Sequence, residues 1–229
     1  MAKQYTRVLT IAGSDSGGGA GIQADLKTIS ALGCYGMSVL TALTAQNTVA
    51  VTGIMEVEPK FVAQQMDAVL EDIGVDAVKI GMLSSPEIIA AVAERLRYYE
   101  IKTIVLDPVM VAKSGDKLLR DEAIDALKSE LLPLATVITP NIPEAEVLTG
   151  ITINSKTALE QSAFMLLRQG PAVLIKGGHF ADKHSDDGLA MNTPHGPELV
   201  WLQGERIDSK NTHGTGCTLS SAIAAFLAK

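Results

Sequence analysis

The sequence predicts an α/β protein with three layers, in which a mostly parallel central sheet carries helices on both faces. Short β-branched and aliphatic runs, typical of buried strands, alternate with longer amphipathic segments along all 229 residues. Such alternation is typical of parallel strands joined by helical crossovers, which cover both faces of the sheet. No internal repeat and no linker divides the chain, so we expect one domain over residues 1–229.

Each predicted strand and helix is based on a local pattern of apolar residues in the sequence. Buried strands are expected at residues 8–12, 38–45, 77–80, 103–106, 136–138 and 172–175. Helical stripes are formed by Val62, Met66, Val69 and Ile73; by Ile89, Val92, Ala93 and Leu96; and by Leu159, Ser162, Ala163 and Leu166, with Gly170 and Pro171 as a stop signal. The more polar segment from about residue 181 to 206 predicts an antiparallel edge or a mobile flap.

The composition excludes several classes of protein. A net charge of −7 argues against a general nucleic-acid binder, because no basic surplus exists to neutralise phosphates. The first apolar run, residues 8–12, is too short for a signal peptide core or a membrane span. Only Cys34 and Cys217 are present, which indicates a reducing compartment rather than a disulfide framework. We therefore expect a cytoplasmic protein without nucleic-acid or membrane partners.

The most informative stretch is residues 211–217, Asn-Thr-His-Gly-Thr-Gly-Cys, which runs into an Ala-rich helical pattern. A helix that begins here leaves unpaired N–H groups of Gly214, Thr215 and Gly216 at its positive end, where proteins bind phosphate. Cys217 falls in the first turn, where the same field favours thiolate. A free cysteine is more often a small buried hydrophobe, but this position favours a phosphoryl-transfer centre.

Six further polar motifs each follow a predicted strand. Because the carboxyl ends of parallel strands form the ligand crevice of such sheets, six clusters on one edge predict a site. The motifs are Gly13-Ser14-Asp15, Gln46-Asn47, Gly81-Met82-Leu83, Asp107-Pro108-Val109, Thr139-Pro140-Asn141 and Lys176-Gly177-Gly178-His179.

Two of the pocket candidates, Asp25 and Gln46, have explanations that compete. Asp25 lies in the first turns of a helix, which the helix dipole explains as well as substrate binding does. The Gln46 amide donates and accepts, as a heteroaromatic ring with an amino group requires, yet it also fits a cap of neighbouring backbone. Met82 and Val109 indicate apolar pocket walls.

The candidates for nucleotide binding have similar alternatives. Asp107 and Glu144 are candidates for ordering phosphates or Mg²⁺, which usually keeps several water ligands. Asn141 also fits a simple N-cap of the next helix. Lys176 directly follows an apolar strand, so it emerges at the sheet edge, where it suits a phosphate contact.

A dinucleotide site is weakly suggested by residues 19–24, which match G-x-G-x-x-A. That interpretation needs an acidic residue at the end of the second strand, and none occurs between Asp25 and Glu56. A Walker A sequence is also absent. A tight strand-to-helix turn explains the glycines equally simply.

Together these motifs resemble the hydroxymethylpyrimidine/phosphomethylpyrimidine kinases of thiamine biosynthesis, within the ribokinase-like superfamily. The resemblance covers nearly the whole chain. It is carried by residues 12–15, 18–25, 41–47, 79–83, 107–110, 112–115, 139–141, 143–145, 176–179 and 211–217.

The resemblance implies a ribokinase-like homodimer that uses MgATP to phosphorylate 4-amino-5-hydroxymethyl-2-methylpyrimidine and then its monophosphate. It also implies roles for single residues. Cys217 is the implied base, with the amides of Gly214, Thr215 and Gly216 beside it. The implied pyrimidine pocket is Gln46, Gly13, Asp25, Met82 and Val109; the implied ATP site is Asp107, Asn141, Glu144, Lys176 and Thr212, with Asp107 and Glu144 toward Mg²⁺.

Two other functions remain open at this point. Related enzymes phosphorylate pyridoxal or pyridoxine, whose ring is similar. The chain also fits a catalytically inactive protein that binds a nucleotide or a vitamin precursor. Family members continue beyond the position of Lys229 and use that region near adenine, so we expect the adenine pocket to be incomplete here.

Overall fold

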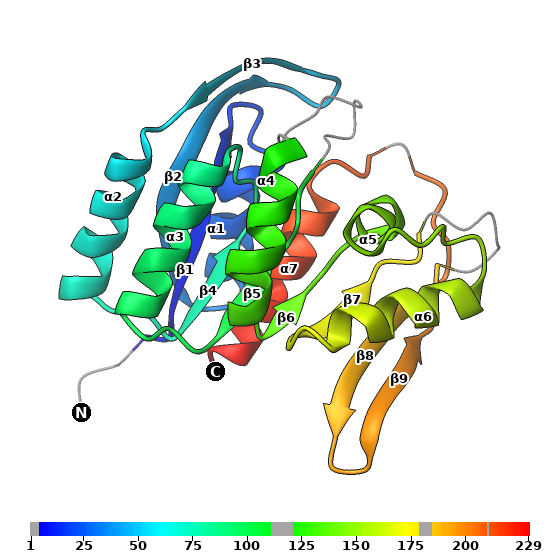
Figure 1. The fold of residues 1–229 in the computed structure, drawn as a ribbon. Helices are drawn as coiled ribbons and strands as arrows, with labels where there is room; N and C mark the ends of the chain where they lie inside the picture. Colours follow the sequence, from blue (N-terminus) through cyan, green and yellow to red (C-terminus); the bar gives the residue numbers. More distant parts are fainter. Residues whose placement is uncertain (1–4, 111–120, 179–184, 210) are drawn as a thin grey trace.

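The computed structural model describes residues 5–110, 121–178, 185–209 and 211–229, and these form one sheet of nine strands (Figure 1). From edge to edge the strands are β3 (Val51–Glu56), β2 (Tyr35–Gln46), β1 (Arg7–Asp15), β4 (Ala77–Ile80), β5 (Ile104–Leu106), β6 (Val137–Ile138), β7 (Ala172–Ile175), β8 (Asp187–Thr193) and β9 (Gly196–Leu202). The strands from β2 to β7 in this order are parallel, while β3, β8 and β9 pair antiparallel with their neighbours. The predicted mostly parallel sheet is confirmed.

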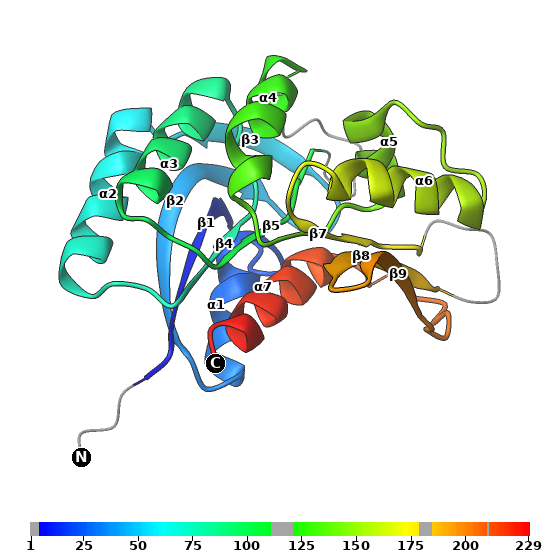
Figure 2. The same cartoon turned by 60° about the horizontal axis from the view of Figure 1, so that its bottom comes forward.

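Helices cover both faces of the sheet (Figures 1 and 2). They are α1 (Gly21–Ala31), α2 (Pro59–Asp72), α3 (Pro86–Tyr98), α4 (Asp121–Ala126), α5 (Ile142–Thr149), α6 (Lys156–Leu167) and α7 (Thr215–Leu227). The larger core cluster joins the sheet to α2, α3 and α6 through residues such as Val62, Ile88 and Leu159. A smaller cluster joins it to α1 and α7 through Ile29 and Ala224. The three predicted layers are therefore present.

Two details differ from the sequence-based expectation. β3 was not predicted, because its residues are half-buried or exposed and leave no buried apolar run. β1 continues through Gly13, Ser14 and Asp15, with a register shift between Ala12 and Ser14, so this motif belongs to the strand. The β8–β9 hairpin confirms the antiparallel edge, whereas residues 112–115 and 179–184 lie outside the described part.

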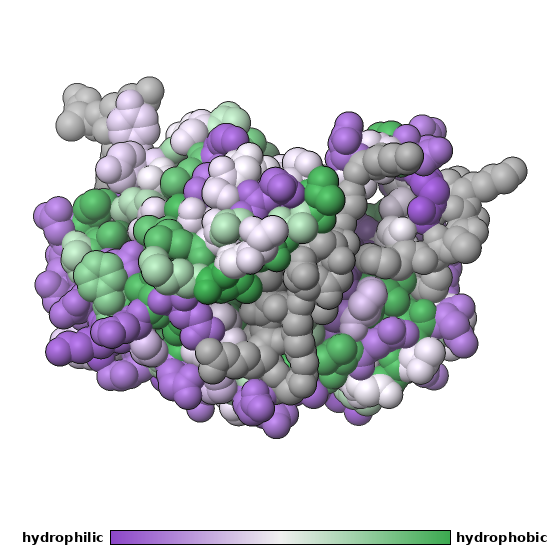
Figure 3. Space-filling model, turned by 90° about the horizontal axis from the view of Figure 1, so that it is seen from above, coloured by the Kyte–Doolittle hydropathy of each residue, from purple (hydrophilic) through white to green (hydrophobic). Residues whose placement is uncertain are grey.

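The topology places the candidate residues at one edge. β1 has β2 on one side and β4 on the other, so the strand order reverses here, as at the ligand crevice of other open sheets. Gln46 ends β2, Met82 follows β4, Asp107 follows β5 and Lys176 follows β7. Figure 3 looks onto this edge, where hydrophobic and hydrophilic side chains are interspersed. Among the described residues, no helix is long and apolar enough to cross a membrane.

The close approach of β7 and β8 predicts a stability difference between two glycines. A Cβ on Gly177 would overlap the backbone oxygen of Asp186, whereas Gly150 ends α5 with φ 74° in open space. We expect Gly150→Ala to cost about 1 kcal/mol for its left-handed backbone. Gly177→Ala should lower the free energy of unfolding clearly more, as measured by urea denaturation. Equal losses in the two variants would contradict this packing.

Candidate active site

The amino end of α7 is shaped by direct contact with the first glycine loop. Gly214 precedes the helix with φ 80°, and a Cβ at this position would overlap the backbone oxygen of Gly19. The first i→i−4 hydrogen bond is donated by the Thr218 N–H to the Gly214 oxygen at 2.9 Å. The N–H groups of Gly216 and Cys217 precede that bond and lie at the positive end of the helix. The predicted helix start is confirmed.

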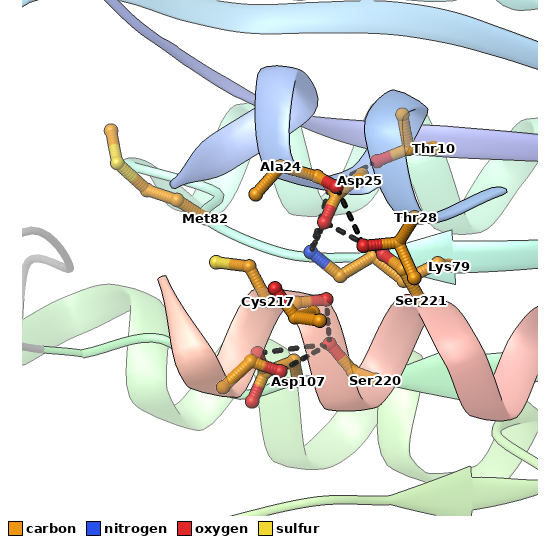
Figure 4. A network of polar contacts seen from close by, with 12 residues as sticks. Thr10, Ala24, Asp25, Thr28, Lys79, Met82, Asp107, Cys217, Ser220 and Ser221 are labelled. Carbon is orange, nitrogen blue, oxygen red and sulfur yellow. Dashed lines mark hydrogen bonds and ion pairs between the residues drawn. The ribbon is translucent and has the colours of Figure 1, made fainter. Parts of the chain in front are cut away.

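Cys217 is half-buried, and its sulfur lies on the side of α7 that faces Lys79 and Met82 (Figure 4). Burial raises the pKa of its thiol above the usual value, and the charges of Asp107 and Asp25 add to this. The Lys79 ammonium and the Gly21 N–H oppose the shift without cancelling it. The expectation that the helix end favours thiolate is therefore wrong for this structure, because desolvation and two carboxylates outweigh it.

A second group of charges lies beside the first turn of α7. Asp107 is buried, and its Oδ1 lies 3.1 Å from the Lys176 ammonium and accepts a hydrogen bond from Thr139. Burial alone would raise the pKa of Asp107, but the charges of Lys176 and Lys79 hold it below its usual value. A Cβ on Gly216 would lie 3.3 Å from the Lys176 ammonium. This glycine therefore leaves room for the cation beside the helix end.

Asn141 and Glu144 form a reciprocal cap at the start of α5. The Asn141 side chain accepts from the Glu144 N–H at 2.9 Å, and the Glu144 carboxylate accepts from the Asn141 N–H at 2.8 Å. A β-bridge between the backbones of Asn141 and Lys176 places this cap beside the Asp107–Lys176 pair. Burial raises the pKa of Glu144 to about 7, with Asp107 adding to the shift and Lys176 opposing it. The N-cap explanation for Asn141 is confirmed, while a nucleotide contact stays a prediction.

The acidic residues fit a nucleotide-bound Mg²⁺ better than a cage built from protein alone. Within the described residues, no three His, Cys, Asp or Glu side chains gather as a ligand set. Mg²⁺ in phosphoryl-transfer sites typically takes one or two carboxylates, waters and substrate phosphates. Asp107 and Glu144 supply two such carboxylates next to Lys176.

A small apolar cluster lies at the topological reversal. Met82 and Ala42 are buried there, with Val51 and Val109 packed against them. A Cβ on Gly13 would lie 3.4 Å from the Met82 sulfur, so Gly13 lies directly beside this cluster. The structure thus brings together three predicted pocket residues, Gly13, Met82 and Val109.

Gln46 and Thr212 are less constrained. Gln46 is half-buried at the end of β2, where its Oε1 accepts from the Thr44 hydroxyl at 3.0 Å. Thr212 is exposed, and its backbone oxygen accepts hydrogen bonds from Thr215. Neither contact tests the roles predicted for these two residues.

Asp25 differs from the expectation that it lines the pyrimidine pocket. Its side chain is fully buried, and its oxygens accept from Thr10 at 2.6 Å and from Ser221 at 2.7 Å. Both oxygens also lie within 3.0 Å of the Lys79 ammonium. The carboxylate is therefore occupied by the protein beneath α7, and no accessible surface remains for a substrate.

Sequence reasoning missed the roles of Lys79 and Asp15. Lys79 is fully buried in β4, and its presence inside an apolar strand was the available signal. Asp15 accepts from the N–H groups of Gly17, Gly19 and Ala20, and lies 2.8 Å from His213 Nε2. Burial would raise its pKa, but these hydrogen bonds, that to His213 first, lower it. Asp15 thus ties the glycine loop after β1 to the loop before α7.

Comparison with known proteins connects this site to one family. The model of the family described as phosphomethylpyrimidine kinase matches residues 15–229. The hydroxymethylpyrimidine/phosphomethylpyrimidine kinase of Rhizobium meliloti is 56% identical over 223 residues, which are 96% of this chain and 82% of that protein. The Escherichia coli protein of the same name is 53% identical, over 95% and 81% of the two chains. The bifunctional thiamine biosynthesis protein ThiED of Geobacter sulfurreducens is 56% identical over 97% of this chain, which spans 45% of its length.

Similar solved structures agree with this family assignment. The phosphomethylpyrimidine kinase of Clostridium difficile superposes with a TM-score of 0.83 at 49% identity, over 97% of this chain and 90% of that one. An ADP complex of Bacillus subtilis pyridoxal kinase gives a TM-score of 0.88 at 36% identity, over 98% and 84%. The fold is therefore ribokinase-like. The family model, the relatives and the solved structures agree, so the chain belongs to the phosphomethylpyrimidine kinase family, whose members are phosphotransferases of thiamine biosynthesis.

Proposed function

We propose that this chain transfers phosphate from MgATP to the hydroxymethyl group of 4-amino-5-hydroxymethyl-2-methylpyrimidine, and then to the resulting monophosphate. One observation carries the proposal most directly. The amino end of α7 lies beside Lys176 and has Cys217 in its first turn, and Met82 of the apolar cluster lies near the same end of the helix (Figure 4). A phosphoryl donor and a flat, mostly apolar ring thus meet at one group of backbone N–H donors. The names of the most similar relatives support this choice of acceptor.

The role proposed for each residue follows from the chemistry of phosphoryl transfer. Phosphoryl transfer needs little covalent help from the protein, so in-line positioning and charge stabilisation dominate. The amides of Gly214 and Gly216 would meet the charge that develops on the transferred group. The Thr215 N–H, which donates to the Thr212 oxygen at 3.4 Å, would leave that bond to join them. Lys176 would contact the ATP phosphates, and Asn141 and Thr212 would line the same site.

The proposed Mg²⁺ site consists of Asp107 and Glu144. A bound Mg²⁺ would neutralise phosphate charge between the two reacting molecules. Glu144 would act through water, because its carboxylate already accepts the Asn141 N–H. Since the pKa of Glu144 is raised to about 7, the carboxyl is poised to lose a proton when a cation approaches.

Cys217 is proposed as the base of the first phosphorylation only. The hydroxymethyl group must lose a proton as it attacks, and a thiol in the first turn of α7 is placed to accept it. In the second phosphorylation the attacking group is a phosphate, which is already ionised near neutral pH. A base is then of little use.

Replacement of Cys217 should therefore separate the two steps. We expect Cys217→Ala to lower kcat of the first phosphorylation by about 10²- to 10⁴-fold, the usual contribution of a general base, and to affect the second step far less. Steady-state assays with each acceptor measure this. The control is Cys34→Ala, which removes the other free cysteine, a buried one. Equal losses of both steps in Cys217→Ala would refute the assignment.

The raised pKa of Cys217 also predicts a pH dependence. Because the thiolate fraction grows as pH rises toward that pKa, kcat of the first step should increase from pH 7 into the alkaline range. The second step should lack this increase. Profiles of the two acceptors measured side by side test this; identical alkaline limbs would contradict a base role for Cys217.

Gln46 should affect the pyrimidine and not the nucleotide. We expect Gln46→Ala to raise KM for the pyrimidine by about tenfold, the effect of losing hydrogen bonds to a buried ring, with KM for ATP near wild type. Gln65 offers a matched control, because its amide is bound to the backbone of Leu40 at 2.9 and 3.1 Å. Gln65→Ala should lower stability without raising KM. An unchanged pyrimidine KM in Gln46→Ala would remove Gln46 from the pocket.

Pyridoxal is a second acceptor to test, because solved neighbours from two organisms are pyridoxal kinases. The Staphylococcus aureus enzyme in complex with pyridoxal has a TM-score of 0.88 at 35% identity. We propose the pyrimidine as the preferred acceptor, since the pyrimidine kinases are more similar in sequence. A coupled ADP assay with the pyrimidine, pyridoxal and no acceptor decides between them. Absence of acceptor-dependent ADP release would instead favour an inactive binding protein.

We also propose a cytoplasmic homodimer. The β2–β3 hairpin presents Leu43, Ile54 and Met55 with exposed fractions of 42%, 42% and 61%, and exposed apolar groups of this kind are typical of interfaces. Both cysteines are free, which suits a reducing compartment. Light scattering after size exclusion tests the dimer, and a monomeric mass would contradict it.

A further inference from the structure

Two buried carboxylates contact helix α7 through consecutive serines. Ser220 donates to Asp107 at 3.2 Å, and Ser221 donates to Asp25 at 2.7 Å (Figure 4). Asp107 already belongs to the proposed nucleotide site. Asp25 has no such role, because its side chain has no exposed surface.

The Asp25 carboxylate joins four elements at one point. From its position on α1 it accepts from Thr10 on β1, from Lys79 on β4 and from Ser221 on α7. All four residues have an exposed fraction of 0%. Figure 4 shows the Lys79 ammonium between this carboxylate and α7. A Cβ on Gly81 would lie 2.8 Å from that ammonium, so glycine at this position leaves space for it.

Apart from the contact of Gly214 with the Gly19 backbone, the amino-terminal half of α7 has no fully buried apolar residue to hold it. Its buried residues are Ser220 and Ser221 in the middle, and Ala224 and Ala225 in the second half. Only the alanines belong to a core cluster. The sequence before Ser220 is Thr-Gly-Cys-Thr-Leu, which contributes no fully buried apolar anchor. Together with the contact between Gly214 and the Gly19 backbone, the polar contacts of the two serines therefore determine how this end of the helix is placed.

A contribution to stability is a poor explanation for the Asp25–Lys79 ion pair. Burying two charges costs desolvation that their attraction barely repays, and apolar replacements are often at least as stable. Such a pair does fix the orientation of the groups bound to it, because its hydrogen bonds require one geometry. Ser221 lies four residues after Cys217, so both project from the same face of the helix. Fixing Ser221 therefore fixes the thiol and the first-turn N–H groups.

We infer that Asp25 is a positioning residue for phosphoryl transfer: together with Lys79 it holds Ser221, and so aligns the amino end of α7, without touching the pyrimidine. The inference deepens the proposed function, because the aligned groups are those to which that function gives the chemistry. This positioning role differs from the role that the family resemblance implied, in which Asp25 binds the substrate.

The test compares two variants that each remove one hydroxyl from the same carboxylate. Ser221→Ala breaks the contact with α7, and Thr10→Val breaks the contact with β1 in a nearly isosteric way. Both should lower the melting temperature. Ser221→Ala should also lower kcat of both phosphorylations by about 10- to 100-fold, the effect expected of a small misplacement, with the pyrimidine KM within about twofold. Thr10→Val should keep kcat within about twofold of wild type.

Two results would overturn the inference. One is an equal fall of kcat in both variants, which would make Asp25 a general stabiliser. The other is a rise of the pyrimidine KM in Ser221→Ala as large as that in Gln46→Ala, which would return Asp25 to the pocket.

A binding measurement keeps this test separate from the proposed acceptor. Calorimetric titration with a nonhydrolysable ATP analogue should show weaker binding in Ser221→Ala and unchanged binding in Thr10→Val, whichever alcohol is phosphorylated. If neither pyrimidine nor pyridoxal stimulates ADP release by the wild type, the proposed function fails, and this comparison still decides the positioning role. Equal affinities in the two variants would contradict it.

Discussion

The site depends on one constraint, which is that the first turn of α7 must lie against the carboxyl ends of β1, β4 and β5. Three contacts impose it. Gly214 lies against the backbone of Gly19, Ser220 donates to Asp107 after β5, and Ser221 reaches the Asp25–Lys79 pair between α1 and β4. These contacts come from segments distant in sequence, and they make the amino end of the helix part of the sheet edge.

The charges around this helix end are balanced in pairs. Asp25 lies against Lys79, and Asp107 lies against Lys176, so two carboxylates and two ammonium groups surround one thiol. With the formal charges cancelled, desolvation dominates, and it raises the pKa of Cys217. A raised pKa leaves only a small fraction of the thiol ionised at neutral pH, which is consistent with the proposal that positioning and charge stabilisation contribute most.

The sequence predicted the buried strands and the helices with apolar stripes, because burial imposes a readable pattern on them. The exposed strand β3 has no such pattern and was missed. Chemical candidates at strand ends, such as Asp107 and Lys176, were found because each follows a buried strand. The position of Asp25 could not be predicted, since the dipole of its own helix explained the residue locally, and its partners Thr10, Lys79 and Ser221 become neighbours only in the folded chain.

The most direct test of this account is a crystal structure of the chain with a nonhydrolysable ATP analogue and the hydroxymethylpyrimidine. The account predicts that the terminal phosphate accepts hydrogen bonds from the first-turn N–H groups of α7. It also predicts the pyrimidine hydroxyl within hydrogen-bond reach of the Cys217 sulfur, with Asp25 still bound to Lys79 and Ser221. A pyrimidine bound to the Asp25 carboxylate, or a terminal phosphate located away from α7, would contradict it.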